Sequence, residues 1–194
     1  MERIKSTKSL EELLASTRAA ISSGKLSEAE KSKLEEYCKQ FEQMPGEERE
    51  SIDYFYRHMP GAESDVTLIV LKGHLLIEQK IREFVSERML SPAALDDARL
   101  TSHQVICLAE ALTLPNDEPR LLWSILRKLN TLRNQLAHNL IPKGIEQRVQ
   151  EILTDYSKMW QVQAGFIGVL AHAYGQVSEL CRLARNPSFQ IRGR

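Results

Sequence analysis

One stretch decides the fold, and it runs from Val66 to Arg88 with the sequence VTLIVLKGHLLIEQKIREFVSER. Because an α-helix advances about 100° per residue, the apolar residues of this stretch lie on nearly all sides of a helix axis. A helix with so wide an apolar surface is buried on more than one side. The stretch therefore predicts a core helix that other helices cover.

The sequence on both sides of this helix is helical in pattern as well. No long alternation of β-branched and polar residues occurs, and glycines and prolines fall mostly between periodic segments. Ser9 and Ser27 each have a glutamate three residues later, which is the pattern of a capping box. The chain is therefore predicted to be all-α, with helices at about 10–22, 27–44, 47–58, 66–88, 102–112, 116–140, 145–158 and up to 185, and a short helix starting at 91–92.

Composition predicts three parts along the chain. Residues 1–60 are rich in charge and poor in apolar residues, which indicates an N-terminal helical arm. Residues 61–186 hold the strongly apolar helical segments and form the predicted bundle. The pair Asn186-Pro187 stops the last helix and leaves residues 187–194 as a C-terminal tail.

Charge, cysteines and hydropathy narrow the function classes. The chain has 194 residues, with 26 lysines and arginines and 26 aspartates and glutamates, and this balance argues against bulk electrostatic capture of nucleic acid or membrane. The three cysteines form no metal-binding pattern, and there is no glycine-rich phosphate loop, so neither metal nor cofactor is expected. No apolar run approaches a membrane span and no signal peptide is evident, so we expect no membrane partner and a cytoplasmic location.

The groups that could carry chemistry gather in one run, Arg133-Asn134-Gln135-Leu136-Ala137-His138, near the end of the predicted helix 116–140. On the helical wheel Asn130, Asn134 and His138 lie on the polar face, opposite the leucine stripe. Arg133 lies at the edge of that stripe, about 140° from His138. One straight helix therefore cannot aim both groups at a single phosphate, and the site needs either a helix end near His138 or a second copy of the helix.

An arginine at the edge of an apolar stripe needs a partner, because a buried unpaired guanidinium is very costly. Glu78 is the carboxylate in the middle of the predicted core helix. We therefore expect Glu78 and Arg133 to approach each other between two packed helices, either as a structural pair or as support for the site.

The Arg-Asn-x-x-x-His run resembles the R-x4-6-H signature of the HEPN superfamily, and the resemblance extends over roughly residues 65–185. The flanking Asn130 fits it, and the upstream helix with Glu78 is similar to the first core helix of that family. The resemblance implies a HEPN-like bundle that dimerises through the motif helices and cuts RNA without a metal, as toxins or antiviral effectors do. It implies His138 as the acid/base group, Arg133 as the cation for the phosphate and Asn134 as the orienting amide, with an antitoxin or another regulatory protein as a further partner.

Two other interpretations remain open at this point. His138 can serve as a simple favourable charge at the C-terminus of its helix. The whole domain can be a non-catalytic module that binds a nucleotide, a nucleic acid or a protein, as some HEPN proteins do. Balanced charge favours the binding module, whereas the intact Arg, Asn and His set favours the enzyme. His74, four residues before Glu78, is expected to be a hydrogen-bonded core histidine rather than a second catalytic base.

Overall fold

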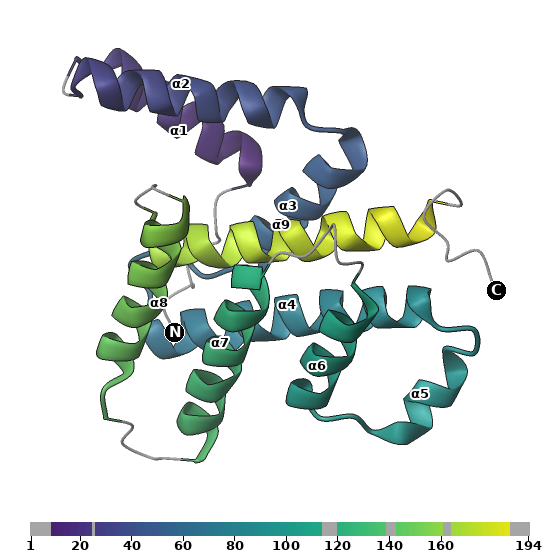
Figure 1. Ribbon diagram of the computed structural model, residues 1–194. Helices are drawn as coiled ribbons and strands as arrows, with labels where there is room; N and C mark the ends of the chain where they lie inside the picture. The colour runs from purple at the N-terminus through teal and green to yellow at the C-terminus, as the bar shows by residue number, and fades with distance from the viewer. Residues whose placement is uncertain (1–8, 25, 114–119, 139–142, 161–163, 187–194) are drawn as a thin grey trace, which may run out of the picture. The chain divides into compact units, whose positions relative to one another are not determined.

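The computed structural model describes residues 9–24, 26–113, 120–138, 143–160 and 164–186, and all regular structure in these ranges is α-helical. The predicted all-α class is therefore confirmed. The helices are α1 Leu10–Ser22, α2 Glu28–Gln43, α3 Gly46–His58, α4 Val66–Arg88, α5 Ala93–Ala98, α6 Ser102–Leu112, α7 Arg120–His138, α8 Ile145–Trp160 and α9 Phe166–Arg185 (Figure 1). Residues 116–119 and 139–140 of the predicted motif helix lie outside the described ranges.

The chain divides into two compact units, residues 1–61 and residues 62–194. In the first unit α1 packs against α2 and α3. The predicted capping boxes at Ser9 and Ser27 are both formed, and they start α1 and α2. Asp53 Oδ1 in α3 accepts a hydrogen bond of 2.9 Å from the backbone of Leu10, which ties the start of α1 to α3.

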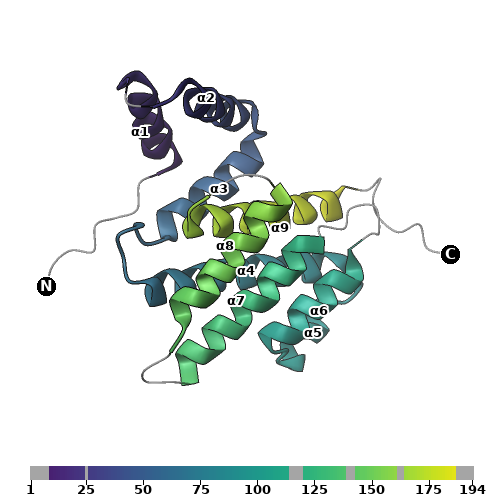
Figure 2. The same cartoon turned by 60° about the vertical axis from the view of Figure 1, so that its left-hand side comes forward.

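The second unit is built around α4, as the apolar pattern of residues 66–88 predicts. α4 runs alongside α9, its most extensive neighbour, and α6 and α7 cross it on another side (Figures 1 and 2). Burial on several sides requires apolar residues around most of the helix. The buried residues of α4 are Ile69, Val70, Gly73, His74, Leu76, Ile77, Ile81, Phe84 and Val85.

α7 and α8 form a pair beside this core. A cluster of Ile125, Ile152, Tyr156 and Val169 joins α7, α8 and α9. The C-terminal end of α7, which carries the Arg-Asn-x-x-x-His run, lies near the start of α8 (Figure 1). None of the helices in the described part of the chain combines the length and the apolarity that a membrane crossing requires.

Candidate functional site

α7 is held by its apolar side, which determines where its polar residues lie. The predicted apolar stripe consists of Leu122, Ile125, Leu129, Leu132 and Leu136. The first four are buried and Leu136 is half-buried. Asn134 is exposed on the last turns of α7, and Arg133 beside it is half-buried. The rotation of α7 about its own axis therefore decides in which direction these polar side chains point.

Arg133 and Asn134 are joined directly, because Arg133 Nη1 donates a hydrogen bond of 3.1 Å to Asn134 Oδ1. His138 is exposed in the final turn of the same helix. Among the described residues no carboxylate forms an ion pair with Arg133 or His138. The guanidinium uses one donor on Asn134, and its planar fork of further donors suits an oxyanion such as phosphate.

Glu78 does not form the expected pair with Arg133. Its Oε1 accepts hydrogen bonds from Arg82 Nε at 3.0 Å and Arg82 Nη2 at 2.6 Å, and its Oε2 accepts one of 2.8 Å from Ser102 Oγ. The expectation of a Glu78–Arg133 ion pair was wrong, because Arg82 lies one turn along α4 on the same face and reaches the carboxylate locally. Partial burial raises the pKa of Glu78, but the bonds from Arg82 and Ser102 outweigh it, so the pKa lies below its ordinary value.

Asn130 does not lie on the solvent face, where the helical wheel placed it. It is 6% exposed, and its Oδ1 lies 3.2 Å from His74 Nε2 in α4. The wheel prediction failed because α4 covers more than the leucine stripe of α7. Trp123, which is fully buried and seven residues before Asn130, faces the same way and was the signal in the sequence for this burial.

His74 is a buried, hydrogen-bonded core histidine, as expected. Its Nδ1 lies 3.5 Å from Glu78 Oε2, on the opposite side of the ring from Asn130. Burial lowers the pKa of His74, and the charge of Arg133 lowers it further, while Glu78 and Asn130 act in the opposite direction. The imidazole is therefore neutral at neutral pH.

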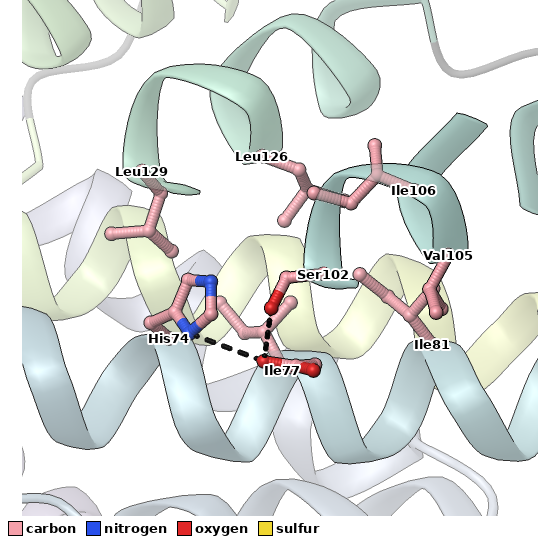
Figure 3. Close-up of a pocket in the computed structure, with 9 residues that line it drawn as sticks. His74, Ile77, Ile81, Ser102, Val105, Ile106, Leu126 and Leu129 are labelled. Carbon is pink, nitrogen blue, oxygen red and sulfur yellow. Dashed lines mark hydrogen bonds and ion pairs between the residues drawn. The ribbon is translucent and has the colours of Figure 1, made fainter. Parts of the chain in front are cut away.

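Side chains from α4, α6 and α7 meet at a small cavity, where Glu78 Oε2 lies 3.5 Å from His74 Nδ1 and accepts a hydrogen bond from Ser102. Figure 3 shows His74 and Ser102 with dashed lines that run to the same unlabelled carboxylate. The cavity measures about 10 Å³ and is otherwise lined by isoleucine, leucine and valine. A space of that size holds about one water molecule. The polar chain of Asn130, His74, Glu78 and Ser102 is therefore internal support rather than a ligand pocket. Sequence reasoning missed Ser102 and Arg82, although the four-residue spacing of Glu78 and Arg82 on one helix was visible.

Two other basic side chains of α7 form ion pairs with acidic residues. Arg127 pairs with Glu110 of α6, and Lys128 pairs with Asp155 of α8. Arg133 therefore differs from its neighbours on α7 in having no acidic partner in the described chain. No group of three or more histidine, cysteine, aspartate or glutamate side chains suited to a metal ion occurs in the described ranges.

Comparisons with protein-family models, with curated proteins and with solved structures find no match for this chain. The candidate site on α7 consists of the half-buried Arg133 and the exposed Asn134 and His138. Asn130, one turn before Asn134, is buried against His74.

Proposed function

We propose that the chain is a metal-independent endoribonuclease of the HEPN kind, of toxin or antiviral-defence type, that acts as a homodimer. The observation that carries this proposal is the exposed end of α7. There Arg133 donates to Asn134, and His138 follows one turn after Asn134. A fixed cation, which here has no acidic partner among the residues that the structure describes, and an exposed imidazole are the two groups that metal-free RNA cleavage requires.

The proposed reaction is a transesterification at phosphorus. His138 removes the proton from a ribose 2′-hydroxyl, and the 2′-oxygen then attacks the adjacent phosphorus. The bond from phosphorus to the 5′-oxygen then breaks, and the 5′-oxygen takes a proton from the imidazolium of a protonated His138. A 2′,3′-cyclic phosphate remains on the other product. Arg133 stabilises the negative charge that develops on the phosphoryl oxygens, and Asn134 holds the guanidinium in place.

The angular separation of the two groups supports a homodimer. Arg133 and His138 are five positions apart, so their side chains point about 140° apart on a regular helix. α7 ends at His138, so Arg133 lies inside the helix and His138 is its last residue. A second copy of α7 across a two-fold axis supplies the histidine that one copy cannot aim at the phosphate held by its own Arg133.

The test is cleavage of a mixed pool of single-stranded and structured RNA in EDTA. Wild type is compared with Arg133→Ala and His138→Ala, and the product ends are analysed for cyclic phosphate. Arg127→Ala and His103→Ala are matched controls, because Arg127 is an ion-paired arginine on the same helix and His103 is an exposed histidine on α6. We expect wild type and both controls to cut RNA, and we expect the two site variants to lose at least about 100-fold in rate.

A second candidate is a non-catalytic module that binds a nucleotide, a nucleic acid or a protein. The observation that favours it is the neutralisation of Arg127 and Lys128 by acidic partners, which leaves α7 without the extended cationic surface that a long RNA strand requires. Wild-type protein that is folded and dimeric but leaves the RNA pool intact would replace the nuclease with this candidate.

A further inference from the structure

Two polar side chains are buried where α7 crosses α4. His74 and Asn130 are each 6% exposed, and the contact between their Nε2 and Oδ1 atoms measures 3.2 Å. Buried polar groups need such partners, because an unmade hydrogen bond leaves the desolvation penalty uncompensated. The contact therefore restrains both helices and is more than a chance approach.

The surroundings of this hydrogen bond are apolar. Ile77 from α4 and Leu126 and Leu129 from α7 lie close by. Burial of apolar surface has no preferred direction, so leucines on α7 tolerate some rotation of the helix about its axis. A hydrogen bond weakens steeply once it is misaligned. The His74–Asn130 bond is therefore the contact in this region that is most sensitive to the rotation of α7.

The ring of His74 donates to Asn130 from Nε2. A neutral imidazole carries one N–H, and the oxygen Oδ1 of Asn130 faces Nε2 at hydrogen-bond distance. On the other side of the ring, Nδ1 lies 3.5 Å from Glu78 Oε2, which is longer than a good hydrogen bond. Arg82 and Ser102 donate hydrogen bonds to Glu78 and so restrain its carboxylate on the Nδ1 side of the ring.

The orientation of the side chains on the next turn of α7 depends on the hydrogen bond between His74 and Asn130. Arg133 and Asn134 follow Asn130 by three and four positions, which places them on the adjacent turn on either side of it. Any rotation of α7 that breaks the His74–Asn130 bond moves both residues together. The hydrogen bond between Arg133 and Asn134 joins neighbours on one helix, and it does not restrain that motion.

We propose that His74 is a positioning residue for the Arg133–Asn134 pair: it holds Asn130, and through Asn130 it fixes the rotation of the turn that presents the arginine. The effect on cleavage rests on the proposed ribonuclease function, whereas the effect on the geometry of Arg133 does not. His74 is too deeply buried to touch a substrate, so its contribution is made through Asn130.

Two amide substitutions separate the two sides of the ring. In His74→Gln the side-chain amide reaches the position of Nε2 and can still donate to Asn130. In His74→Asn the shorter amide reaches only the position of Nδ1, beside Glu78. Both variants are polar and smaller than histidine, so they disturb the core to a similar degree. Each is made in the full chain, and its stability is measured by urea unfolding.

The first readout is the NMR signal of the Arg133 Nε–H group and of the Asn134 side-chain amide, in protein without RNA. We expect His74→Gln to keep both signals at their wild-type positions and His74→Asn to move both. The second readout is cleavage of the RNA pool, for which we expect a loss of about 10- to 100-fold in kcat for His74→Asn, with KM little changed, and a much smaller loss for His74→Gln. Equal effects of the two variants at equal stability would overturn the proposal.

A double variant, His74→Leu with Asn130→Leu, covers the case in which the single variants fail to fold. It replaces the polar pair by apolar groups and leaves no unmatched donor. If the pair is purely structural, the NMR signals of Arg133 and Asn134 should stay at their wild-type positions in this variant. If His74 has a positioning role, both signals should move. If wild-type protein does not cut RNA, the proposed function fails, and the NMR readout still decides the role of His74.

Discussion

His74 and Asn130 are 56 positions apart in the chain, and their side chains meet in the interior at a distance of 3.2 Å between Nε2 and Oδ1. The pair links the core helix α4 to the helix that carries Arg133, Asn134 and His138. A buried polar contact of this kind depends on both partners, because removal of either leaves the other without a hydrogen bond.

Asn130 and Asn134 provide a direct comparison between a buried and an exposed amide on one helix. Asn130→Leu leaves the Nε2–H of His74 unsatisfied, so we expect the free energy of unfolding to fall by about 1–3 kcal/mol. Asn134→Leu, at an exposed position, is expected to change it by less than about 0.5 kcal/mol. Urea unfolding of both variants measures the difference, and equal losses would contradict the burial of Asn130.

The stability of the protein should fall as the pH drops below about 6.5. Burial lowers the pKa of both His74 and His172 from the ordinary value of 6.5. Below pH 6.5 the unfolded chain therefore binds protons that the folded chain does not, and each histidine contributes a loss of up to about 1.4 kcal/mol per pH unit. Above that pH both states are neutral at these positions, and the contribution is constant.

Urea unfolding between about pH 7.5 and pH 5.5 tests this dependence. Glu78 has a pKa below its ordinary value of 4.5. Its contribution to the free energy of unfolding is therefore lost only at a pH below this range and does not affect the comparison. We expect the variant with both His74→Gln and His172→Gln to lose less stability over this range than wild type. A wild-type free energy of unfolding that stays level across the range would contradict the prediction.

The three cysteines should differ sharply in reactivity. Cys107 is exposed, with its Sγ 3.7 Å from His103 Nε2, whereas Cys38 and Cys181 are buried. Burial raises the pKa of the Cys181 thiol to about 12, and the thiolate is the reactive form. We expect a thiol reagent to modify one cysteine rapidly in native protein and all three in urea. Cys107→Ser should abolish the rapid phase, and a rapid phase that survives this change would show that a buried cysteine is accessible.

The start of α6 is predicted to depend on Thr101. Its Oγ1 accepts a hydrogen bond from the backbone of Gln104, and the Gln104 side chain accepts one of 2.9 Å from the backbone of Thr101. Thr101→Ala should therefore lower the free energy of unfolding by about 1 kcal/mol, and Thr101→Ser should restore most of it. Thr131→Ala, at an exposed position inside α7, is the matched control. Losses of the same size for Thr101→Ala and Thr101→Ser would argue against the cap.

The local features of the fold were open to prediction from the sequence. The capping boxes at Ser9 and Ser27, the bounds of residues 10–22, 66–88 and 102–112, and the burial of the helix 66–88 all appear as expected. They depend on residues within one or two turns of each other, so the sequence alone carries the information. The exposure of Asn134 and His138 agrees with the helical wheel, whereas the burial of Asn130 does not.

The partners of the buried polar groups were decided only by the tertiary structure. A helical wheel places Asn130 toward solvent, because it gives the direction of a side chain but does not tell which helix lies opposite. The sequence favours Arg133 as the partner of Glu78 across the core, whereas in the structure Glu78 binds Arg82 and Ser102. By itself the sequence determined the helices and their apolar faces, because capping and amphipathic periodicity are local. The crossing of α4 and α7 decided which polar groups meet, because that contact joins residues that are distant in the chain.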